Sequence, residues 1–412
     1  MKSDVDQLMR EAGLDALLIT GPVAHNPNKA YFTGLVHVTS GYLLKKVGEP
    51  PVLFHRSMER DEAAHSGLET KSIEDYRPTD LIEKSKGDHL QAEVLLLQKI
   101  MDDYEVSGGV ALYGKAEFGA AFGVFDRLQE GLDGIELVGE PENSSVLSRA
   151  RATKDEQEVE RIRQMGKITT AVVGDVADFL TSHQPKDGVL VNRGGDVLTI
   201  GEVKRRIKMW LAMRGAEDLT GTIFSIGRDA GVPHSAGKDE QPVELGKTII
   251  FDLFPSEAGG GYFYDFTRTW CLGWAPDEVE ALYQDVLEVY HSVFDRLQID
   301  APCRDFQNMT CDEFEAKGHA TIRSNPDATE GYVHSLAHGL GLAVHEAPGF
   351  SYAESNRDTL LADTVFTFEP GLYYPERGAG VRLEDTVWVN PKGGFEILAE
   401  YPMDLVLKIP GA

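Results

Sequence analysis

The sequence predicts two domains, an α/β domain over residues 1–152 followed by an α+β domain over residues 153–412. The chain has 412 residues, and because domains of about 150 residues are common, two or three are expected. In the first part, short helical and strand patterns alternate, which is typical of a sheet covered by helices. In the second part, long amphipathic helices are separated by pairs of strands, which favours an α+β arrangement.

The elements of the first domain follow from hydrophobic periodicity. Short apolar runs rich in β-branched residues predict strands, and longer stretches with apolar residues three and four apart predict helices. In chain order we expect a helix over 4–12, a strand over 16–20, strands over 42–46 and 51–55, a helix over 88–104, and strands over 109–113 and 135–138.

The second domain begins where the pattern changes, after residues 144–153. An apolar stripe on a strongly charged background predicts a long helix over 154–180. Further helices are expected over 202–212 and around 279–293, and hairpins with glycine-containing turns are expected from 248–253 with 262–271 and from 364–372 with 380–389. The order helix, helix, hairpin thus occurs twice, which indicates pseudo-twofold symmetry.

Composition excludes several classes of partner. The 40 Lys and Arg residues and 67 Asp and Glu residues give a net charge of −27, which repels nucleic-acid backbones and anionic lipid surfaces. We therefore expect no nucleic-acid and no membrane partner. Only three cysteines occur, without metal-ligand spacing, and no membrane-spanning run or apolar leader is apparent, so a cytoplasmic location is expected.

Five potential metal ligands stand out in the second domain. Asp252 and Asp265 lie on the two arms of the first expected hairpin, at inward strand positions, and Glu369 and Glu384 repeat this arrangement on the second. His338 adds a nitrogen ligand. A single strand aspartate is usually a turn cap or an ion-pair partner, but like charges on facing arms require a cation between them. This oxygen-rich set suits two divalent ions such as manganese, cobalt or zinc.

These residues and their local strings resemble a known family. The order of the five ligands, with the strings DFTRT, HGLGLAVHE, EPGLYY and GVRLED, is similar to that of the pita-bread metallopeptidases, in the proline-specific branch of prolidases and Xaa-Pro aminopeptidases. Residues 1–152 resemble that branch's creatinase/prolidase-type N-terminal domain, and residues 148–156 resemble its junction. The resemblance covers essentially the whole chain and implies a pita-bread catalytic domain with pseudo-twofold symmetry.

The resemblance also implies roles for the ligands. Asp265 and Glu384 would bridge two metal ions, Asp252 would complete the shell of one, and His338 with Glu369 that of the other. Manganese is the preferred ion, with zinc or cobalt as alternatives. In the family a hydroxide held between the metals attacks the scissile carbonyl, and Glu369 would relay its proton.

Further polar residues are implied to assist. By resemblance, His234 and His345 would contact the substrate carbonyl or the oxyanion, and His334 would line the proline pocket. Arg382 would support a bridging carboxylate or meet the substrate, and Tyr373 could do either. Considered without the family, each of the three histidines is explained equally well as a structural residue.

Two departures from the family pattern concern the subfamily rather than the ligands. Asp252 and Asp265 are 13 positions apart, two more than is usual, and the excess lies in the glycine-rich stretch 255–261, where a longer hairpin tip can absorb it. The first position of the usual Gly-His-Gly triplet is Ala337.

The preferred activity is that of a dinuclear metal-dependent Xaa-Pro dipeptidase, a prolidase, with a proline-containing peptide as substrate and a homodimer as the family's usual assembly. Its short N-terminal domain favours the dipeptidase, because in the family a neighbouring protomer's N-terminal domain can roof the site. The alternative is an Xaa-Pro aminopeptidase acting on longer peptides. A metal-free creatinase-like C–N hydrolase and a non-catalytic peptide-binding protein are weaker alternatives, because all five ligands are intact and buried acids without a cation are costly.

Overall fold

The computed structural model describes residues 4–412 and divides the chain into two compact units. The N-terminal unit comprises Met1–Arg151 with Gly259–Gly261, and the C-terminal unit comprises Ala152–Ala258 with Tyr262–Ala412. Within residues 4–412, no helix combines the length and the apolar character needed to cross a bilayer.

The N-terminal unit is built on a six-stranded mixed sheet in the order β4-β3-β2-β1-β5-β6. Strands β1 and β5 are parallel, as are β5 and β6, whereas β2 is antiparallel to both of its neighbours. The strands are β1 (Ala16–Thr20), β2 (Tyr42–Lys46), β3 (Val52–His55), β4 (Glu69–Ser72), β5 (Gly108–Gly114) and β6 (Ile135–Val138).

Helices cover both faces of this sheet because the strands are apolar on both sides. In β1, for example, Leu17, Leu18 and Ile19 are all at most 1% exposed. Helices α4, α5 and α6 pack on one face in a common core with Leu18, and α2 contacts β1 and β5. The helices are α1 (Val5–Glu11), α2 (Pro27–Thr33), α3 (Arg60–Ala64), α4 (Pro78–Lys84), α5 (His89–Asp103), α6 (Phe118–Glu130) and α7 (Val146–Ala152).

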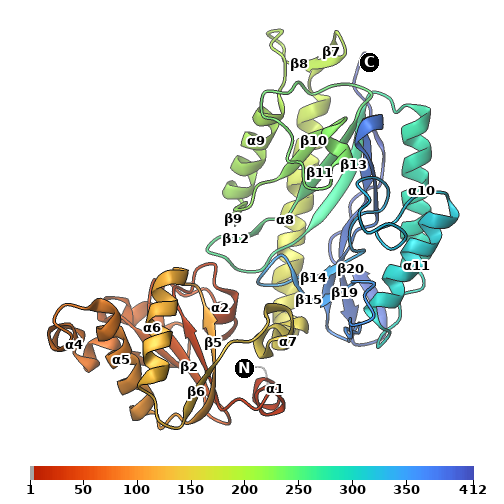
Figure 1. Cartoon of the computed structure of the whole chain (residues 1–412). Coiled ribbons are helices and arrows are strands. Elements are labelled where there is room, and N and C mark those ends of the chain that lie inside the picture. Colours follow the sequence, from red (N-terminus) through yellow and green to blue (C-terminus); the bar gives the residue numbers. More distant parts are fainter. Residues whose placement is uncertain (1–3) are drawn as a thin grey trace. The chain divides into compact units, whose positions relative to one another are not determined.

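Four long helices frame the C-terminal unit (Figure 1): α8 (Glu156–Thr181), α9 (Ile200–Met213), α10 (Asp277–Phe294) and α11 (Cys303–Ala316). Helix α8 starts where the sequence supplies a capping box. The Asp155 carboxylate accepts hydrogen bonds from the backbone N–H groups of Gln157 and Glu158, and the Glu158 side chain accepts one from the Asp155 N–H. These bonds satisfy donors that a helix N-terminus leaves free.

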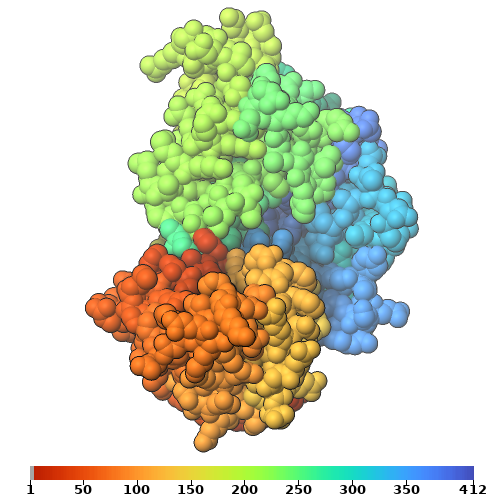
Figure 2. All heavy atoms as spheres, turned by 60° about the vertical axis from the view of Figure 1, so that its left-hand side comes forward, coloured from red at the N-terminus to blue at the C-terminus, as the bar shows by residue number. Residues whose placement is uncertain are grey.

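The strands of this unit form two larger sheets, of order β10-β11-β13-β21 and β15-β14-β16-β19-β20, and smaller ladders β9-β12, β17-β18 and β7-β8. In Figure 2, both the green, earlier segments and the blue, later segments of this unit lie on the face that is shown. The strands are β7 (Gln184–Lys186), β8 (Val189–Val191), β9 (Ala216–Glu217), β10 (Ile223–Ile226), β11 (Thr248–Leu253), β12 (Ser256–Glu257), β13 (Phe266–Leu272), β14 (His338–Gly339), β15 (Glu346–Gly349), β16 (Val365–Phe368), β17 (Gly371–Tyr374), β18 (Ala379–Arg382), β19 (Asp385–Asn390), β20 (Gly394–Ile397) and β21 (Val406–Leu407).

The second expected hairpin differs from the prediction because both of its arms are interrupted. Strand β16 pairs with β19, and β17 pairs with β18 in a separate ladder. The breaks lie opposite each other, at Glu369 and Pro370 on one arm and at Leu383 and Glu384 on the other. Pro370 has no N–H to donate to a ladder, and the Glu384 N–H bonds instead to the Thr267 carbonyl of β13.

The first expected hairpin also differs at its tip. Asp265 lies directly before β13 rather than within it, because its N–H bonds to the Thr386 hydroxyl instead of entering the ladder. The glycine-rich stretch contains β12, which pairs with β9. Several elements had no sequence-based expectation, among them α2, α6, α11 and the short strands β10, β14 and β15.

Candidate metal centre

Three buried acidic side chains and a histidine converge inside the C-terminal unit. Asp252, Asp265 and Glu384 are 7%, 5% and 2% exposed, far below the usual exposure of acidic residues. One ligand atom from each of Asp265, His338 and Glu384 lies within 4.8 Å of the others. This geometry fits a site for a metal ion.

The strand register brings the two hairpins together. Asp252 in β11 pairs with Thr267 in β13, and Thr267 pairs in turn with Glu384 through an isolated antiparallel bridge. The break in the second hairpin is therefore what allows Glu384 to reach the first. The Glu369 N–H bonds to the Leu336 carbonyl, which places Glu369 beside the segment that carries His338.

The orientation of His338 leaves one ring nitrogen free for a cation. Its Nδ1 lies 3.0 Å from the Gly339 carbonyl oxygen, to which only a protonated Nδ1 can donate. Its Nε2 lies 3.7 Å from Asp265 Oδ2 and 3.5 Å from Glu369 Oε1. A backbone carbonyl that fixes the tautomer in this way is typical of metal-binding histidines.

Without a cation between them, the pKa values of three acids and of His338 are shifted in the direction that favours the neutral form of each group. Burial raises the pKa of Asp265 well above its ordinary value, and the charge of Glu384 raises it further. Burial, followed by the charge of Glu384, also raises the pKa of Glu369. The pKa of Glu384 is raised to about 8 by burial and then by Asp252. Burial and the charge of His345 lower the pKa of His338 to about 3, so its imidazole is neutral.

The donor set fits one or more divalent cations. Oδ1 of Asp252 and Oδ1 of Asp265 are buried and have no hydrogen-bond partner among the described residues, and buried polar atoms without partners are rare in folded proteins. Carboxylate oxygens with one imidazole suit manganese, zinc and similar ions. We infer that the acids and His338 would hold the metal of this protein.

Arg382 links the acidic cluster to a second polar network. Its Nη2 makes an ion pair with Asp252, and its Nε donates to the Thr267 hydroxyl at 3.1 Å. Its Nη1 donates to the Tyr373 hydroxyl at 2.8 Å. Both members of the ion pair are at most 10% exposed, so removal of either one would leave the other buried without this partner.

Tyr373 continues this network to His334. The Tyr373 hydroxyl lies 2.8 Å from His334 Nε2, and His334 Nδ1 lies 2.7 Å from the Ser335 carbonyl oxygen. Because a carbonyl only accepts, Nδ1 carries the proton and the Tyr373 hydroxyl donates to Nε2. Burial, with the nearby charge of Arg382, lowers the pKa of His334 to about 3. His334 is therefore neutral, and its Nδ1 lies 3.8 Å from Glu369 Oε2.

The remaining two histidines lie at the edge of the cluster. The rings of His345 and His338 are 4.4 Å apart, centroid to centroid, in an edge-to-face arrangement. His234 is exposed in a turn, and its charge contributes to lowering the pKa of both His334 and His345. The structure thus brings all ten residues singled out in the sequence to one region of the C-terminal unit.

Two threonines complete the site and were not expected from the sequence. The Thr267 hydroxyl donates to Glu384 Oε2 at 2.6 Å. The Thr367 hydroxyl lies 3.5 Å from Glu369 Oε1 and accepts a hydrogen bond from the His338 N–H. Each threonine is two residues from an acid of the site, and side chains two apart on an extended strand share a face. A threonine two residues from a candidate ligand was therefore the sequence pattern that could have predicted these two residues.

Fold and site together define a class: a two-unit protein whose second unit repeats a helix, helix, hairpin order. That unit gathers acids from both hairpins and a histidine from β14 into a candidate metal site. The model of metallopeptidase family M24 matches residues 160–391, and the model of the creatinase/prolidase N-terminal domain matches residues 3–142. The first match covers more than half of the chain. The chain therefore belongs to metallopeptidase family M24.

Relatives along the whole chain agree with this family. The Xaa-Pro dipeptidase of Pyrococcus horikoshii is 25% identical over 401 residues, which is 97% of each chain. Among solved structures, the X-Pro aminopeptidase from Thermotoga maritima has a TM-score of 0.74 at 23% identity and covers 97% of this chain and 99% of its own. The prolidase from Pyrococcus horikoshii has a TM-score of 0.71 at 22% identity and covers 98% of both. The expected pita-bread fold and metallopeptidase class are confirmed.

Proposed function

We propose that the chain is an Xaa-Pro dipeptidase that hydrolyses the peptide bond before proline. The observation that carries this proposal is the convergence of Asp265, His338 and Glu384 within 4.8 Å, in a chain that is similar over nearly its whole length to a named Xaa-Pro dipeptidase. Proline offers no amide N–H, so a protease that hydrogen-bonds that group fails at this bond and a dedicated enzyme is needed.

The proposed cofactor is a pair of divalent ions, with manganese preferred over zinc or cobalt. Asp252, Asp265, His338, Glu369 and Glu384 would hold them. Bound there, the ions would supply an activated water and polarise the scissile carbonyl. The unpartnered oxygens of Asp252 and Asp265 support this assignment.

The chain's own residues would then position the substrate and move the proton. Glu369 would take up the proton of the attacking water and deliver it to the proline nitrogen, which must leave as an amine. His234 and His345 would donate hydrogen bonds to the carbonyl oxygen as it gains charge. His334, Tyr373 and Arg382 would shape the proline side of the site through the hydrogen-bonded chain that joins them.

The wider setting is also a proposal. We place the functional division of the chain at residues 1–152 and 153–412, and propose a homodimer with a peptide as its only other partner. A reducing, cytoplasmic location is supported by the free thiols of Cys271, Cys303 and Cys311, which are all buried.

The decisive experiment compares the dipeptide Ala-Pro with the tripeptide Ala-Pro-Ala, each with metal-stripped protein and after manganese addition. We expect manganese to restore cleavage of the dipeptide, with little cleavage of the tripeptide. The variant Asp265→Asn should lose at least about 100-fold in kcat/KM, since a bridging ligand is changed. Glu240→Gln, which alters an exposed acid of the same unit, should behave as wild type.

Other outcomes would contradict specific parts of the proposal. Preference for the tripeptide would make the protein an Xaa-Pro aminopeptidase. Full activity in excess chelator would rule out the metal-dependent mechanism. If neither peptide is cleaved after addition of manganese, zinc or cobalt, the protein would instead be a non-catalytic peptide-binding protein.

A further inference from the structure

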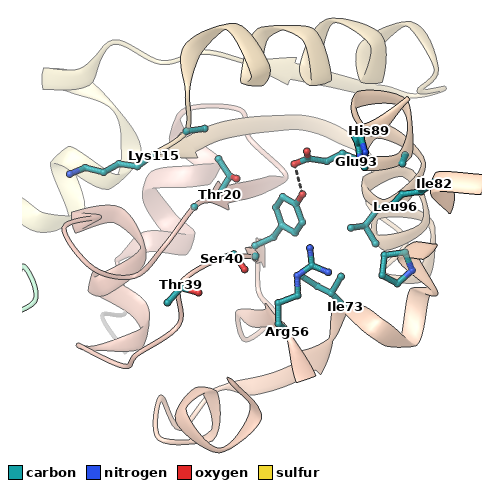
Figure 3. Close-up of a pocket in the computed structure, with 16 residues that line it drawn as sticks. Thr20, Thr39, Ser40, Arg56, Ile73, Ile82, His89, Glu93, Leu96 and Lys115 are labelled. Atoms are coloured by element: carbon teal, nitrogen blue, oxygen red, sulfur yellow. Dashed lines mark hydrogen bonds between the residues drawn. The ribbon is translucent and has the colours of Figure 1, made fainter. Parts of the chain in front are cut away.

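A pocket of about 370 Å³ opens in the N-terminal unit, within a set of residues that the proposed peptidase chemistry does not use. Figure 3 shows the side chains that line it. The volume falls in the range of small-molecule sites. Its lining combines apolar, hydroxyl, cationic and anionic side chains.

The position is where open α/β sheets bind ligands. Thr20 ends β1, Lys115 follows β5, and Arg56 and Ile73 follow β3 and β4, so the carboxyl ends of four strands border the pocket. The chain adds β2, β3 and β4 on one side of β1 and then β5 and β6 on the other side. The order of the strands therefore changes side between β1 and β5. Such a topological switch point leaves a crevice at the carboxyl ends of the strands.

Two glycines form a rigid floor. Gly21 and Gly41 have φ values of 95° and 104°, and a Cβ on either would collide with a backbone carbonyl, of Lys115 and Phe54 respectively. Beneath them the fully buried Lys29 donates from Nζ to the Gly21 carbonyl at 2.6 Å and to the Gly41 carbonyl at 2.9 Å. Burying an ammonium group is costly, and here it holds both loops of the floor in place before any ligand arrives.

The walls of the pocket carry both cationic and anionic side chains. In the view of Figure 3, the Arg56 guanidinium points toward the middle of the pocket, whereas Lys115 extends away from it. Arg56 faces the Glu74 carboxylate at 3.6 Å, which is longer than a hydrogen bond, so its N–H donors stay available. On the opposite side Glu93 accepts a hydrogen bond from the Tyr42 hydroxyl at 2.6 Å through Oε1, and a carboxylate can accept more at its second oxygen.

An apolar wall lies beside these charges. Ile73 and Leu96 are 2% and 7% exposed, and Ile82, which is half-buried, adjoins them. A nucleotide is not favoured, because the loop after β1 reads GPVAHNP and lacks the glycine spacing of a dinucleotide loop. A small ligand with a negative end, a positive end and an apolar body matches the three walls.

We propose that this pocket binds a free amino acid with an apolar side chain, with its carboxylate on Arg56, its ammonium group on Glu93, and its side chain against Ile73, Ile82 and Leu96. The inference concerns the N-terminal unit alone and does not depend on the substrate of the metal centre.

Calorimetric titration of the full-length, metal-loaded protein tests the site, with L-leucine as the probe. We expect one saturable site per chain with a Kd on the order of 0.1–1 mM, as is reasonable for so small a ligand. Glycine, 4-methylpentanoate and 3-methylbutylamine each lack one of the three features, and each should bind at least about 10-fold more weakly.

Variants locate the binding and separate it from the metal centre. Arg56→Gln and Glu93→Gln should each weaken leucine binding by about 10-fold or more, whereas Arg60→Gln, at an exposed arginine outside the pocket, should leave it unchanged. The proposal is overturned if leucine binds the two pocket variants as tightly as wild type, or if Asp265→Asn abolishes the binding. Equal affinity for 4-methylpentanoate or inorganic phosphate would also overturn it and indicate a simple anion site.

Discussion

Asp252 and Arg382 form a buried ion pair at the edge of a cluster of acids. The free energy of unfolding therefore depends strongly on whether both partners are present. In the metal-free protein, removal of Arg382 would leave Asp252 as an uncompensated buried charge. Loss of one partner of such a pair costs several kcal/mol, whereas loss of both can be nearly neutral. The ion pair therefore gives the Asp252 carboxylate a buried cationic partner within the candidate metal site.

We predict that Arg382→Met lowers the free energy of unfolding by about 3–5 kcal/mol in protein dialysed against chelator. The double variant with Asp252→Asn should recover most of that loss. Arg377→Met serves as the control, because Arg377 pairs with Glu278 at 3.6 Å with both side chains more than half exposed, and such a pair contributes under about 1 kcal/mol. Urea unfolding of the four proteins measures these differences. Equal costs for the two arginines would contradict the prediction.

A second prediction concerns protons at the acidic cluster. In the metal-free protein, the pKa of Glu384 is raised to about 8, mainly by burial, and those of Asp265 and Glu369 are also raised. With a pKa of about 8, Glu384 is mostly protonated at pH 7, and a metal must displace that proton. We expect about one or more protons to be released per chain on metal binding at pH 7, with affinity falling as pH falls.

Calorimetry of metal binding in two buffers of different ionisation enthalpy counts those protons. Because the folded-state pKa of Glu384 exceeds its unfolded value, its contribution to the stability of the metal-free chain is greatest in acid and is lost as pH rises through 8. Identical heats in both buffers at pH 7 would show that the acids are already ionised.

At the scale of elements, the site depends on close approach between short strands. His338 and Gly339 form β14, which pairs with β15. A Cβ at Gly339 would meet the backbone of Ala347 and Glu346 far inside van der Waals contact. Glycine is required there by packing, since no positive φ is involved.

Gly339→Ala should therefore lower stability by more than about 2 kcal/mol and weaken metal binding, because β14 must move and carry His338 with it. Gly174→Ala is the matched control: Gly174 lies within α8 with no atom near the added Cβ, so alanine there should stabilise by about 0.5–1 kcal/mol. Thermal unfolding and metal titration of both variants give the answer. Unchanged metal affinity in Gly339→Ala would show that β14 tolerates displacement.

At the scale of the whole molecule, the net charge of −27 acts against the folded state. Like charges repel more strongly in the compact chain than in the expanded one, and salt screens them. Raising sodium chloride from about 0.02 M to 0.5 M, where the screening length falls to a few Å, should therefore raise Tm by a few degrees in the metal-loaded protein. An equal molarity of sucrose controls for effects unrelated to charge, and a Tm that does not rise with salt would contradict the prediction.

The sequence by itself determined most of the long elements and predicted the candidate ligands and their order. Apolar periodicity located β1, β2, α8 and β11 within about two residues, because these elements bury a regular face and the signal is local. The same local strings predicted the acids and histidines of the candidate metal centre, since carboxylates stand out against apolar strands.

Only the tertiary structure decided how these residues meet. The double interruption of the second hairpin, the bridge from Thr267 to Glu384, and the chain from Arg382 through Tyr373 to His334 join positions as much as 117 residues apart. The pocket beside Arg56 and Glu93 likewise depends on which strand ends lie together. Periodicity reports only how one segment is buried, whereas register and strand order depend on the free energy of packing distant segments together.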